Sequence, residues 1–290
     1  MSDMNLDWLD IGKIVEIVEI ASQIMLQIYL NDELFMNMAI ENKDDNSPLT
    51  IADKKANDFI CQELRGLYPE IPIISEENKN ADWEVRKKYT WAWLVDPLDG
   101  TKEFIKRNGE FTVNIGLVYG ERPVAGFVGI PAKGLLYWGS VEGGAWKKEI
   151  DCSNGGGRIT DLREEWKLLK KEGVTRIVAS RSHMDVNTDE YIKKNYLEKG
   201  RKVDLINVGS SMKIIWIAEK KADIYPRLAP TMEWDTCAAH AILNACGGVL
   251  ELVDKGGELT YNKCNLLNPY FIGKLKTQSE KRHQSDHSAE

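Results

Sequence analysis

The chain has few cysteines and no long apolar run. Its five cysteines lie at positions 61, 152, 237, 246 and 264, an odd number without the spacing of a disulfide framework or of a metal-binding motif. This pattern favours reduced thiols in a cytoplasmic setting. No uncharged apolar stretch reaches the length that spans a membrane, and the acidic start of the chain lacks the basic and apolar regions of a targeting signal.

The chain also lacks an excess of positive charge. Its 38 Lys and Arg residues face 45 Asp and Glu residues, which gives a formal net charge of −7. Because polyanions are normally met by a basic face, this balance disfavours a protein that binds nucleic-acid polymers. An anionic substrate would have to be received locally, by metal ions and a few cations. At 290 residues, the chain can bury one large core or two abutting cores.

The pattern of apolar residues predicts two different halves. Residues 10–30 and 53–67 have the spacing of amphipathic helices, and the charged segment 78–89 is predicted to be a mobile loop. Three apolar runs between 111 and 138, separated by Gly and Pro turns, predict an antiparallel meander. From 162 to 246, predicted helices and strands alternate, which favours an α/β arrangement.

We therefore predict an N-terminal half over residues 1–150 with a largely antiparallel sheet, and a C-terminal α/β half over 151–275. A glycine-rich segment at 152–158 would join them. The polar and charged residues 276–290 are predicted to form a disordered tail.

Residues 93–101 form the most informative segment. An apolar strand delivers Asp96 at its tip, and a proline then fixes the backbone so that Asp99 can turn back toward the same ion. Gly100 and Thr101 open the next helix, whose free N–H groups favour an anion. Taken alone, the segment has a less favoured alternative, an Asp-Pro turn with a helix cap.

Two acidic residues distant in sequence favour a metal site at this segment over a simple turn. Glu76 ends a short apolar run, and Asp235 stands at the start of a helix of small residues, where a lone Asp is ordinarily an N-terminal cap. With Asp96 and Asp99, they make an all-oxygen set suited to two divalent cations. Hard oxygen ligands beside an anion-binding helix start suggest Mg²⁺ and phosphate chemistry.

The sequence and spacing of these motifs resemble those of the inositol-monophosphatase-like superfamily of Mg²⁺-dependent, lithium-sensitive phosphatases. Within this superfamily, they resemble the 3′(2′),5′-bisphosphate nucleotidase branch. The segments that carry the resemblance are Asp96 to Ile115, Ser180 to His183, Gly209 to Lys213, Ala222 to Arg227, Glu233 to Ala241 and Leu267 to Phe271. The resemblance implies a layered αβαβα sandwich and removal of the 3′-phosphate of adenosine 3′,5′-bisphosphate, which gives AMP. It also suggests a place in sulfur assimilation, with the sulfated analogue as a further substrate.

For the site, the resemblance implies a water-activating ion and a second ion that neutralises the leaving oxygen. Glu76, Asp96 and the carbonyl of Leu98 would hold the first, and Asp96, Asp99 and Asp235 the second. Glu77 either completes a third site or orients Glu76. Asp53 and Thr101 would bind or activate the attacking water, although each also suits a helix start.

The remaining assignments concern a small, phosphorylated nucleotide substrate. The backbone amides of Gly100 and Thr101 would hold phosphoryl oxygens beside Asp235. Ser210, Ser211 and Lys213 would take a second phosphate at a helix start, or else they belong to a capped helix with a surface Lys. His183 is a candidate for contact with the nucleotide, or else a solvated loop residue, and Arg227 is a candidate for contact with a phosphate or for pairing with a carboxylate.

His240, among small residues, is interpreted as packing or helix capping rather than as catalytic. Two other functions stay open, an inositol or sugar phosphatase and a non-catalytic module that binds phosphate ligands. The oligomeric state is open between monomer and homodimer.

Overall fold

The computed structural model describes residues 5–38, 40–42, 48–150, 157–166, 173–180, 186–254 and 256–277. Three predictions fall partly or wholly outside these ranges. They are the junction predicted at 152–158, of which only 157–158 are described, the role of His183, and the tail predicted at 276–290, of which only 276–277 are described.

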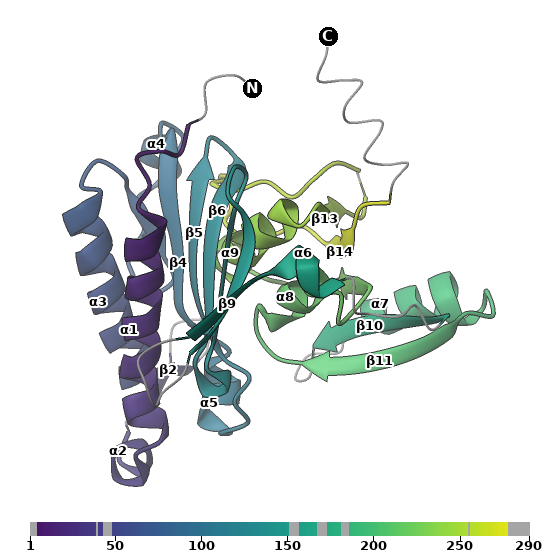
Figure 1. The fold of residues 1–290 in the computed structure, drawn as a ribbon, viewed down its shortest axis with the longest axis horizontal. Helices are drawn as coiled ribbons and strands as arrows, with labels where there is room; N and C mark the ends of the chain where they lie inside the picture. The colour runs from purple at the N-terminus through teal and green to yellow at the C-terminus, as the bar shows by residue number, and fades with distance from the viewer. Residues whose placement is uncertain are drawn as a thin grey trace.

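The chain folds into five layers (Figure 1). Helices α1 (Ile11–Tyr29) and α3 (Ile51–Leu67) cover one face of a seven-stranded sheet. Helices α8 (Met212–Ala218) and α9 (Glu233–Ala245) fill the space between this sheet and a five-stranded sheet. Helix α7 (Val186–Ile192), which continues as a π-helical turn, covers the far side of the second sheet. The predicted αβαβα sandwich is confirmed.

The first sheet is mostly antiparallel. In order across the sheet, its strands are β3 (Ile73–Ser75), β4 (Trp91–Asp99), β5 (Thr112–Tyr119), β6 (Arg122–Ile130), β7 (Leu135–Ser140), β8 (Gly144–Ile150) and β9 (Gly157–Asp161). Only β3 and β4 run parallel, so the predicted meander is confirmed. Because β9 still pairs with β8, this sheet reaches Asp161, beyond the division predicted at residue 150. That division stays a prediction about domains.

The second sheet is mixed. Across it lie β11 (Lys202–Val208), β10 (Val174–Ser180), β12 (Ile224–Arg227), β14 (Phe271–Leu275) and β13 (Gly248–Leu252). Strand β10 is parallel to β11 and to β12, as the alternation of helices and strands predicts. Strands β13 and β14 follow the segment 162–246, in which alternation was predicted, and they pair antiparallel within the predicted half.

Shorter elements connect these layers. They are α2 (Asp32–Met36), β1 (Ile40–Asn42), β2 (Pro48–Thr50), α4 (Trp83–Arg86), α5 (Thr101–Ile105), the 3₁₀ turn η1 (Pro131–Lys133) and α6 (Leu162–Glu165). The segment 78–89 differs from the predicted mobile loop, because it contains α4. Arg86 is buried there and donates to the side-chain oxygen of Asn262 at 3.0 Å and to the backbone carbonyl of Cys264.

Helix α9 lies unusually close to the first sheet. A Cβ atom added to Gly126 on β6 would lie 2.0 Å from the carbonyl oxygen of Ala238, and one added to Gly116 on β5 would lie 2.5 Å from the sulfur of Cys237. Such distances are shorter than any contact between heavy atoms that are not bonded. The two glycines therefore let the helix backbone rest directly on the strands, and this fixes the distance between the first turns of α9 and the first sheet.

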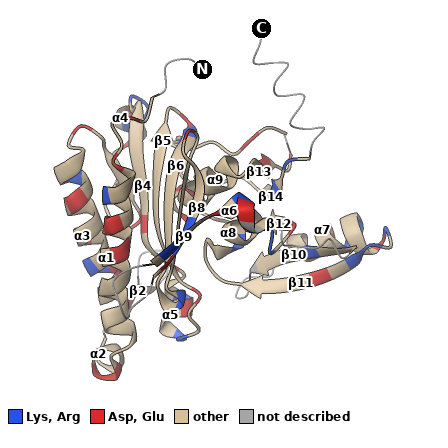
Figure 2. Cartoon of the chain, in the orientation of Figure 1, with Lys and Arg blue, Asp and Glu red and all other residues tan. Residues whose placement is uncertain are grey.

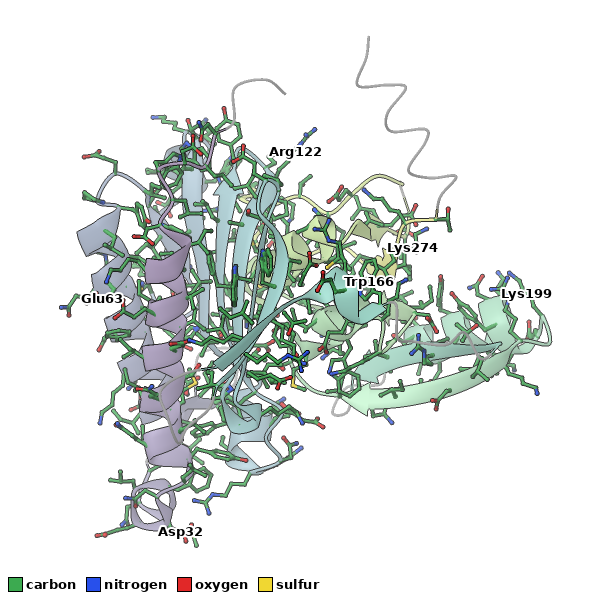
Figure 3. The ribbon with its side chains drawn as sticks, in the orientation of Figure 1. Asp32, Glu63, Arg122, Trp166, Lys199 and Lys274 are labelled. Carbon is green, nitrogen blue, oxygen red and sulfur yellow. The ribbon has the colours of Figure 1, made fainter. Side chains whose placement is uncertain are left out.

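The surface carries both signs of charge. Figure 2 shows both basic and acidic residues along α1, α3 and β11. Among the described residues, no helix is both long enough and apolar enough to cross a bilayer. Trp166, which lies between the two sheets in Figure 3, donates its indole N–H to the carbonyl of Ala218 and so ties α6 to α8.

Candidate active site

The site begins where β4 loses its regular pairing with β5. Asp96 pairs with Asn114 and Asp99 with Thr112, so β4 carries one extra residue between the two pairs. This bulge contains Pro97, which has no N–H to offer a neighbouring strand. The N–H of Leu98 donates to Oδ1 of Asp96 at 3.0 Å, and Asp96 is almost fully buried. Both aspartates line the same cavity.

Asp99 is held by the second half of the chain. Its Oδ2 atom accepts a hydrogen bond at 2.5 Å from the backbone N–H of Ser211, just before α8. The hydroxyl of Ser211 donates to Oδ1 of Asn114 at 2.7 Å and lies 2.8 Å from Oγ1 of Thr112 on β5. The polar groups of Ser211 are therefore used to fasten the loop before α8 to the first sheet.

The two distant acidic residues come to the same place. Asp235 is the third residue of α9, and its Oδ2 accepts the N–H of Met232, the N-cap residue, at 2.9 Å, so it supports the helix start without being the cap residue itself. Glu76 follows β3 directly, and its N–H donates to the carbonyl of Val95 on β4. Both side chains line the cavity that Asp96 and Asp99 face. The structure thus brings together all four carboxylates of the predicted cluster.

Crowding of buried carboxylates changes their protonation. Burial, and then the charges of Glu76, Asp99 and Asp235, raise the pKa of Asp96 well above its ordinary value. Burial, and then Asp99 and Glu76, do the same for the pKa of Asp235. Burial raises the pKa of Asp99 to about 6, against the opposing effects of Lys213 and the Ser211 N–H. A site that gathers negative charge away from water suits a cation.

The donor set fits divalent metal ions in its chemistry. In the described ranges, no three His, Cys, Asp or Glu side chains converge on one point with the spacing of metal ligands. A backbone N–H instead binds one oxygen each of Asp96, Asp99 and Asp235, which orients the carboxylate and would leave its other oxygen for a metal ion. Hard carboxylate oxygens with no sulfur or imidazole among them are the ligands of Mg²⁺ rather than of a softer metal.

Asp53 and Thr101 form a pair behind the carboxylates. Asp53 is fully buried on α3, where it accepts from the N–H of Thr50 at 2.8 Å and from its hydroxyl at 2.5 Å. Its other oxygen accepts from the hydroxyl of Thr101 at 3.2 Å, and the same hydroxyl lies 3.3 Å from the carbonyl of Leu98. Asp53 therefore caps its helix and orients Thr101 at the same time.

The cavity between the two halves has a volume of about 470 Å³. It is lined from the first half by Pro48, Glu76, Asp96, Leu98, Asp99, Gly100, Thr101, Lys102 and Glu103, and from the second by Gly209, Ser210, Ser211, Lys213, Ile214, Tyr225, Arg227, Ala229, Pro230, Thr231, Asp235 and Thr236. Sequence reasoning assigned no role to Tyr225, although its motif carried part of the family resemblance. Gly100 begins α5 with φ +93°, a left-handed conformation that suits glycine.

Lys213 is buried in the cavity wall, so the alternative of a surface lysine is wrong. Its ammonium donates to the carbonyl of Ser210 at 2.6 Å and lies 5.7 Å from the ring centre of Tyr225. Burial lowers the pKa of Lys213 to about 8, although Asp99 acts in the opposite direction. Ser210 has φ +51°, so this lysine stabilises a loop in a rare conformation.

Arg227 supplies a second cation in the same wall. Its guanidinium donates to the carbonyl of Pro230 at 2.6 Å, while its Nε is buried without a hydrogen-bond partner among the described residues. His240 lies elsewhere, fully buried on α9. Its Nδ1 is 2.8 Å from the hydroxyl of Tyr261 and its Nε2 is 3.0 Å from Glu258, which confirms its packing role.

Comparison with known proteins agrees with this geometry. The model of the inositol monophosphatase family matches residues 13–285. The chain belongs to the inositol monophosphatase family. Members of this family are metal-dependent phosphatases.

Within the family, the chain is similar to proteins named 3′(2′),5′-bisphosphate nucleotidase CysQ. The protein from Shigella flexneri is 40% identical over 90% of this chain and 98% of its own length. The one from Salmonella typhimurium is 42% identical over 81% and 88%.

Solved structures agree with the sequence relatives. The crystal structure of CysQ from Bacteroides thetaiotaomicron superposes with a TM-score of 0.79 at 41% identity, and covers 94% of this chain and 100% of that one. The extragenic suppressor protein SuhB from Bartonella henselae, at 19% identity and a TM-score of 0.69, shares the fold over 91% of this chain and 93% of that one.

Proposed function

We propose that this family member removes the 3′-phosphate of adenosine 3′,5′-bisphosphate to give AMP and phosphate, with Mg²⁺ as its cofactor. One observation carries the proposal. Four carboxylates, from the end of β3, from β4 and from α9, meet in one cavity, and two cations, the buried Lys213 and the half-buried Arg227, lie in the wall contributed by the second half. A substrate with two phosphates needs metal ligands for the phosphate that is removed and protein cations for the phosphate that stays. The CysQ relatives, which bear the name of this activity, support the same choice.

Four side chains and one carbonyl would hold two Mg²⁺ ions. They are Glu76, Asp96, Asp99 and Asp235, with the carbonyl of Leu98, and Glu77 either takes part in a third site or orients Glu76. Mg²⁺ supplies Lewis acidity there, for a water nucleophile and for the leaving oxygen.

The protein groups around the phosphate would orient the attacking water and hold the phosphoryl oxygens. Thr101, whose hydroxyl donates to Asp53, would orient the attacking water and pass a proton toward that carboxylate. The backbone N–H groups of Gly100 and Thr101 at the start of α5 would hold the phosphoryl oxygens, where charge accumulates in the transition state. Asp235 would also contact the sugar side of the substrate.

Specificity would come from the opposite wall. Lys213, Arg227 and the hydroxyl of Ser210 would bind the second phosphate, since each lines the cavity and two are cationic. The hydrogen bonds of Ser211 to Asp99 and Asn114 favour a holding role for Ser211 rather than direct contact with phosphate. His183 lies outside the described residues, and its contact with the nucleotide stays a prediction.

Phosphate release from three substrates tests the proposal. We expect rapid release from adenosine 3′,5′-bisphosphate, slower release from inositol 1-phosphate and fructose 1,6-bisphosphate, and none from any of them when Mg²⁺ is chelated. A preference for inositol 1-phosphate would support the alternative, an inositol or sugar phosphatase on the same core. Tight binding without turnover would support a non-catalytic module, which the four carboxylates of the cavity argue against.

The sulfated analogue, 3′-phosphoadenosine 5′-phosphosulfate, is a further proposed substrate, because a 5′-phosphosulfate also presents an anion to Lys213 and Arg227. We place the reaction in the cytoplasm. Of the described cysteines, which are all unpaired, Cys61, Cys237 and Cys246 are buried, as suits a reducing setting.

A further inference from the structure

Asn57 lies one helical turn after Asp53 on α3 and is only 4% exposed. Its side-chain oxygen accepts from the hydroxyl of Ser75 at 2.7 Å and from the thiol of Cys61 at 3.4 Å. Its amide group donates to Oδ1 of Asn78 at 3.0 Å. Two of its three bonds therefore reach across to the turn after β3.

That turn carries Glu76 and Glu77. Ser75, at its start, donates its N–H to Oδ1 of Asn80 at 3.0 Å, and the amide of Asn80 donates back to the carbonyl of Ser75 at 2.9 Å. The N–H of Asn78 also reaches the carbonyl of Ser75. The turn is thus closed on itself, and Asn57 connects it to α3 at both Ser75 and Asn78.

The same face of α3 serves the other part of the site. Residues four apart in a helix lie one above the other, so Asp53 and Asn57 project in the same direction. Asp53 binds the hydroxyl of Thr101, while Asn57 binds the turn that presents Glu76. One rigid helix therefore sets the distance between the Thr101 hydroxyl and the Glu76 carboxylate.

Packing alone gives little reason for a buried asparagine at this position. A polar amide inside a helix costs free energy unless its hydrogen bonds are satisfied, and those of Asn57 are satisfied by the turn. Alanine would suit the buried face of α3, which already contains Ala52 and Ala56.

We propose that Asn57 is a positioning residue for Glu76, which it holds in register with the Asp53–Thr101 pair through Ser75 and Asn78. The inference rests on the proposed function in one respect, that Glu76 is a metal ligand. Partners that orient metal ligands typically change metal affinity or activity by about 10–100-fold when they are removed. Asn57→Ala should therefore weaken metal binding without unfolding the protein.

The test measures binding of Mn²⁺ to chelator-treated protein, by the enhancement of water-proton relaxation and without any substrate. Asn57→Ala should raise the dissociation constant by about 10-fold or more, and Ser75→Ala, which removes the same bond from the other side, by about 3-fold or more. Asn244→Ala is the matched control. Asn244 is also a helical asparagine bound to a side chain, that of Glu258, but it is half-buried and lies away from the cavity, so its loss should leave Mn²⁺ affinity unchanged.

A double-mutant cycle separates positioning from general loosening of the fold. On a Glu76→Gln background, Asn57→Ala should have less than a 2-fold further effect, because its target is already gone. An equal effect on both backgrounds would overturn the proposal, as would wild-type affinity in Asn57→Ala and Ser75→Ala. If Asn57→Ala does not unfold cooperatively, Ser75→Ala decides the question by the same criterion.

The two levels of inference fail differently. Wild-type protein that binds no Mn²⁺ would overturn the proposed function and this proposal together. Wild-type binding that Asn57→Ala and Ser75→Ala leave unchanged would overturn only the role of Asn57.

Discussion

Asp99, at the end of β4, accepts a hydrogen bond at 2.5 Å from the backbone N–H of Ser211, in the loop that leads into α8. The bond joins a candidate metal ligand of the first half to the loop that carries Ser210 and precedes Lys213. A shift of this loop would change the orientation of the Asp99 carboxylate. The two halves of the site are therefore mechanically coupled.

Asp96→Asn should abolish turnover and also stabilise the metal-free protein. Burial and neighbouring carboxylates raise the pKa of Asp96, so the folded protein binds a proton there more tightly than the unfolded chain. The stability that Asp96 contributes below its unfolded pKa is consequently lost as pH rises, and at pH 7 folding carries a penalty, either the uptake of a proton or the burial of a charge. Removing it should raise the melting temperature in chelator by several degrees, because about 1 kcal/mol corresponds to about 2–4 °C in a domain of this size.

Thermal unfolding and phosphate release measure the two effects of Asp96→Asn. Mg²⁺ should raise the melting temperature of the wild type and have a smaller effect on the variant. Asp204→Asn, at an exposed position of β11, is the control and should change neither quantity. Near-wild-type activity, or a melting temperature below that of wild type in chelator, would refute this account of Asp96.

Thr101→Ala and Asp53→Asn should each lower kcat by about 100-fold, with a smaller change in KM, because both act on the attacking water. Their effects on stability should differ. Asp53 also caps α3 through Thr50, so its substitution should cost about 1 kcal/mol, whereas Thr101→Ala should cost little.

Thr101→Ser, which keeps the hydroxyl, should retain most of the activity and serves as the control. Urea unfolding and steady-state kinetics separate the two effects. Losses confined to KM would show instead that these residues only hold substrate.

Lys213→Ala should reduce kcat/KM on adenosine 3′,5′-bisphosphate by about 1.5–3 kcal/mol, the scale of a hydrogen bond to a charged group. Activity on adenosine 3′-monophosphate should change much less, since this substrate has no second phosphate. Lys199→Ala, at the outer end of the second sheet in Figure 3, should affect neither substrate.

A uniform loss on both substrates would have a different explanation. The Lys213 ammonium binds the carbonyl of Ser210, so its removal would then act by loosening the loop before α8. Lys213→Met, which keeps the length of the side chain without its charge, measures how much of the loss is packing.

The contribution of His240 to the free energy of unfolding should fall as pH is lowered through about 6.5, opposite in sign to the contribution of the buried carboxylates. Burial lowers the pKa of His240, although Glu258 opposes the shift, with Tyr261, the Leu250 N–H and the more distant charge of Lys276 as its other neighbours. The unfolded chain therefore binds the proton more tightly, and the contribution of the neutral imidazole is complete only above pH 6.5. One proton gives a slope of up to about 1.4 kcal/mol per pH unit.

Urea unfolding between pH 5 and pH 8 measures that slope. His240→Gln should flatten the curve over this range while leaving phosphate release at pH 8 close to wild type, because His240 does not line the cavity. Equal slopes for the two proteins would show that groups other than His240 determine how the free energy of unfolding depends on pH in this range.

Local patterns predicted much of this molecule. The helical spacing of residues 10–30 gave α1 to within a residue at each end, and Asp96, Asp99 and Asp235 could be placed at strand ends and helix starts from their neighbours alone. What local patterns cannot supply is the partner of a polar group across the fold. The hydroxyl of Ser211 reads as a helix cap in sequence, yet its partners are Asn114 and Thr112, about a hundred residues earlier.

Lys213 shows the same limit. Its helical surroundings are compatible with a surface residue, and only the packing of α8 between two sheets buries it. Asn57 carried no motif at all, because its partners Ser75 and Asn78 lie beyond the end of its helix.

The seat of α9 on Gly116 and Gly126 has a consequence for redesign. A single methyl group at Gly126 would have to push the helix backbone outward, since its Cβ would fall 2.0 Å from a carbonyl oxygen. Asp235, one turn earlier on that helix, would be carried with it. The distance from Asp96 and Asp99 on β4 to Asp235 on α9 can thus be changed by substituting glycines that do not line the cavity. An engineer seeking room for a bulkier phosphate ester could begin at these two glycines and leave every carboxylate untouched.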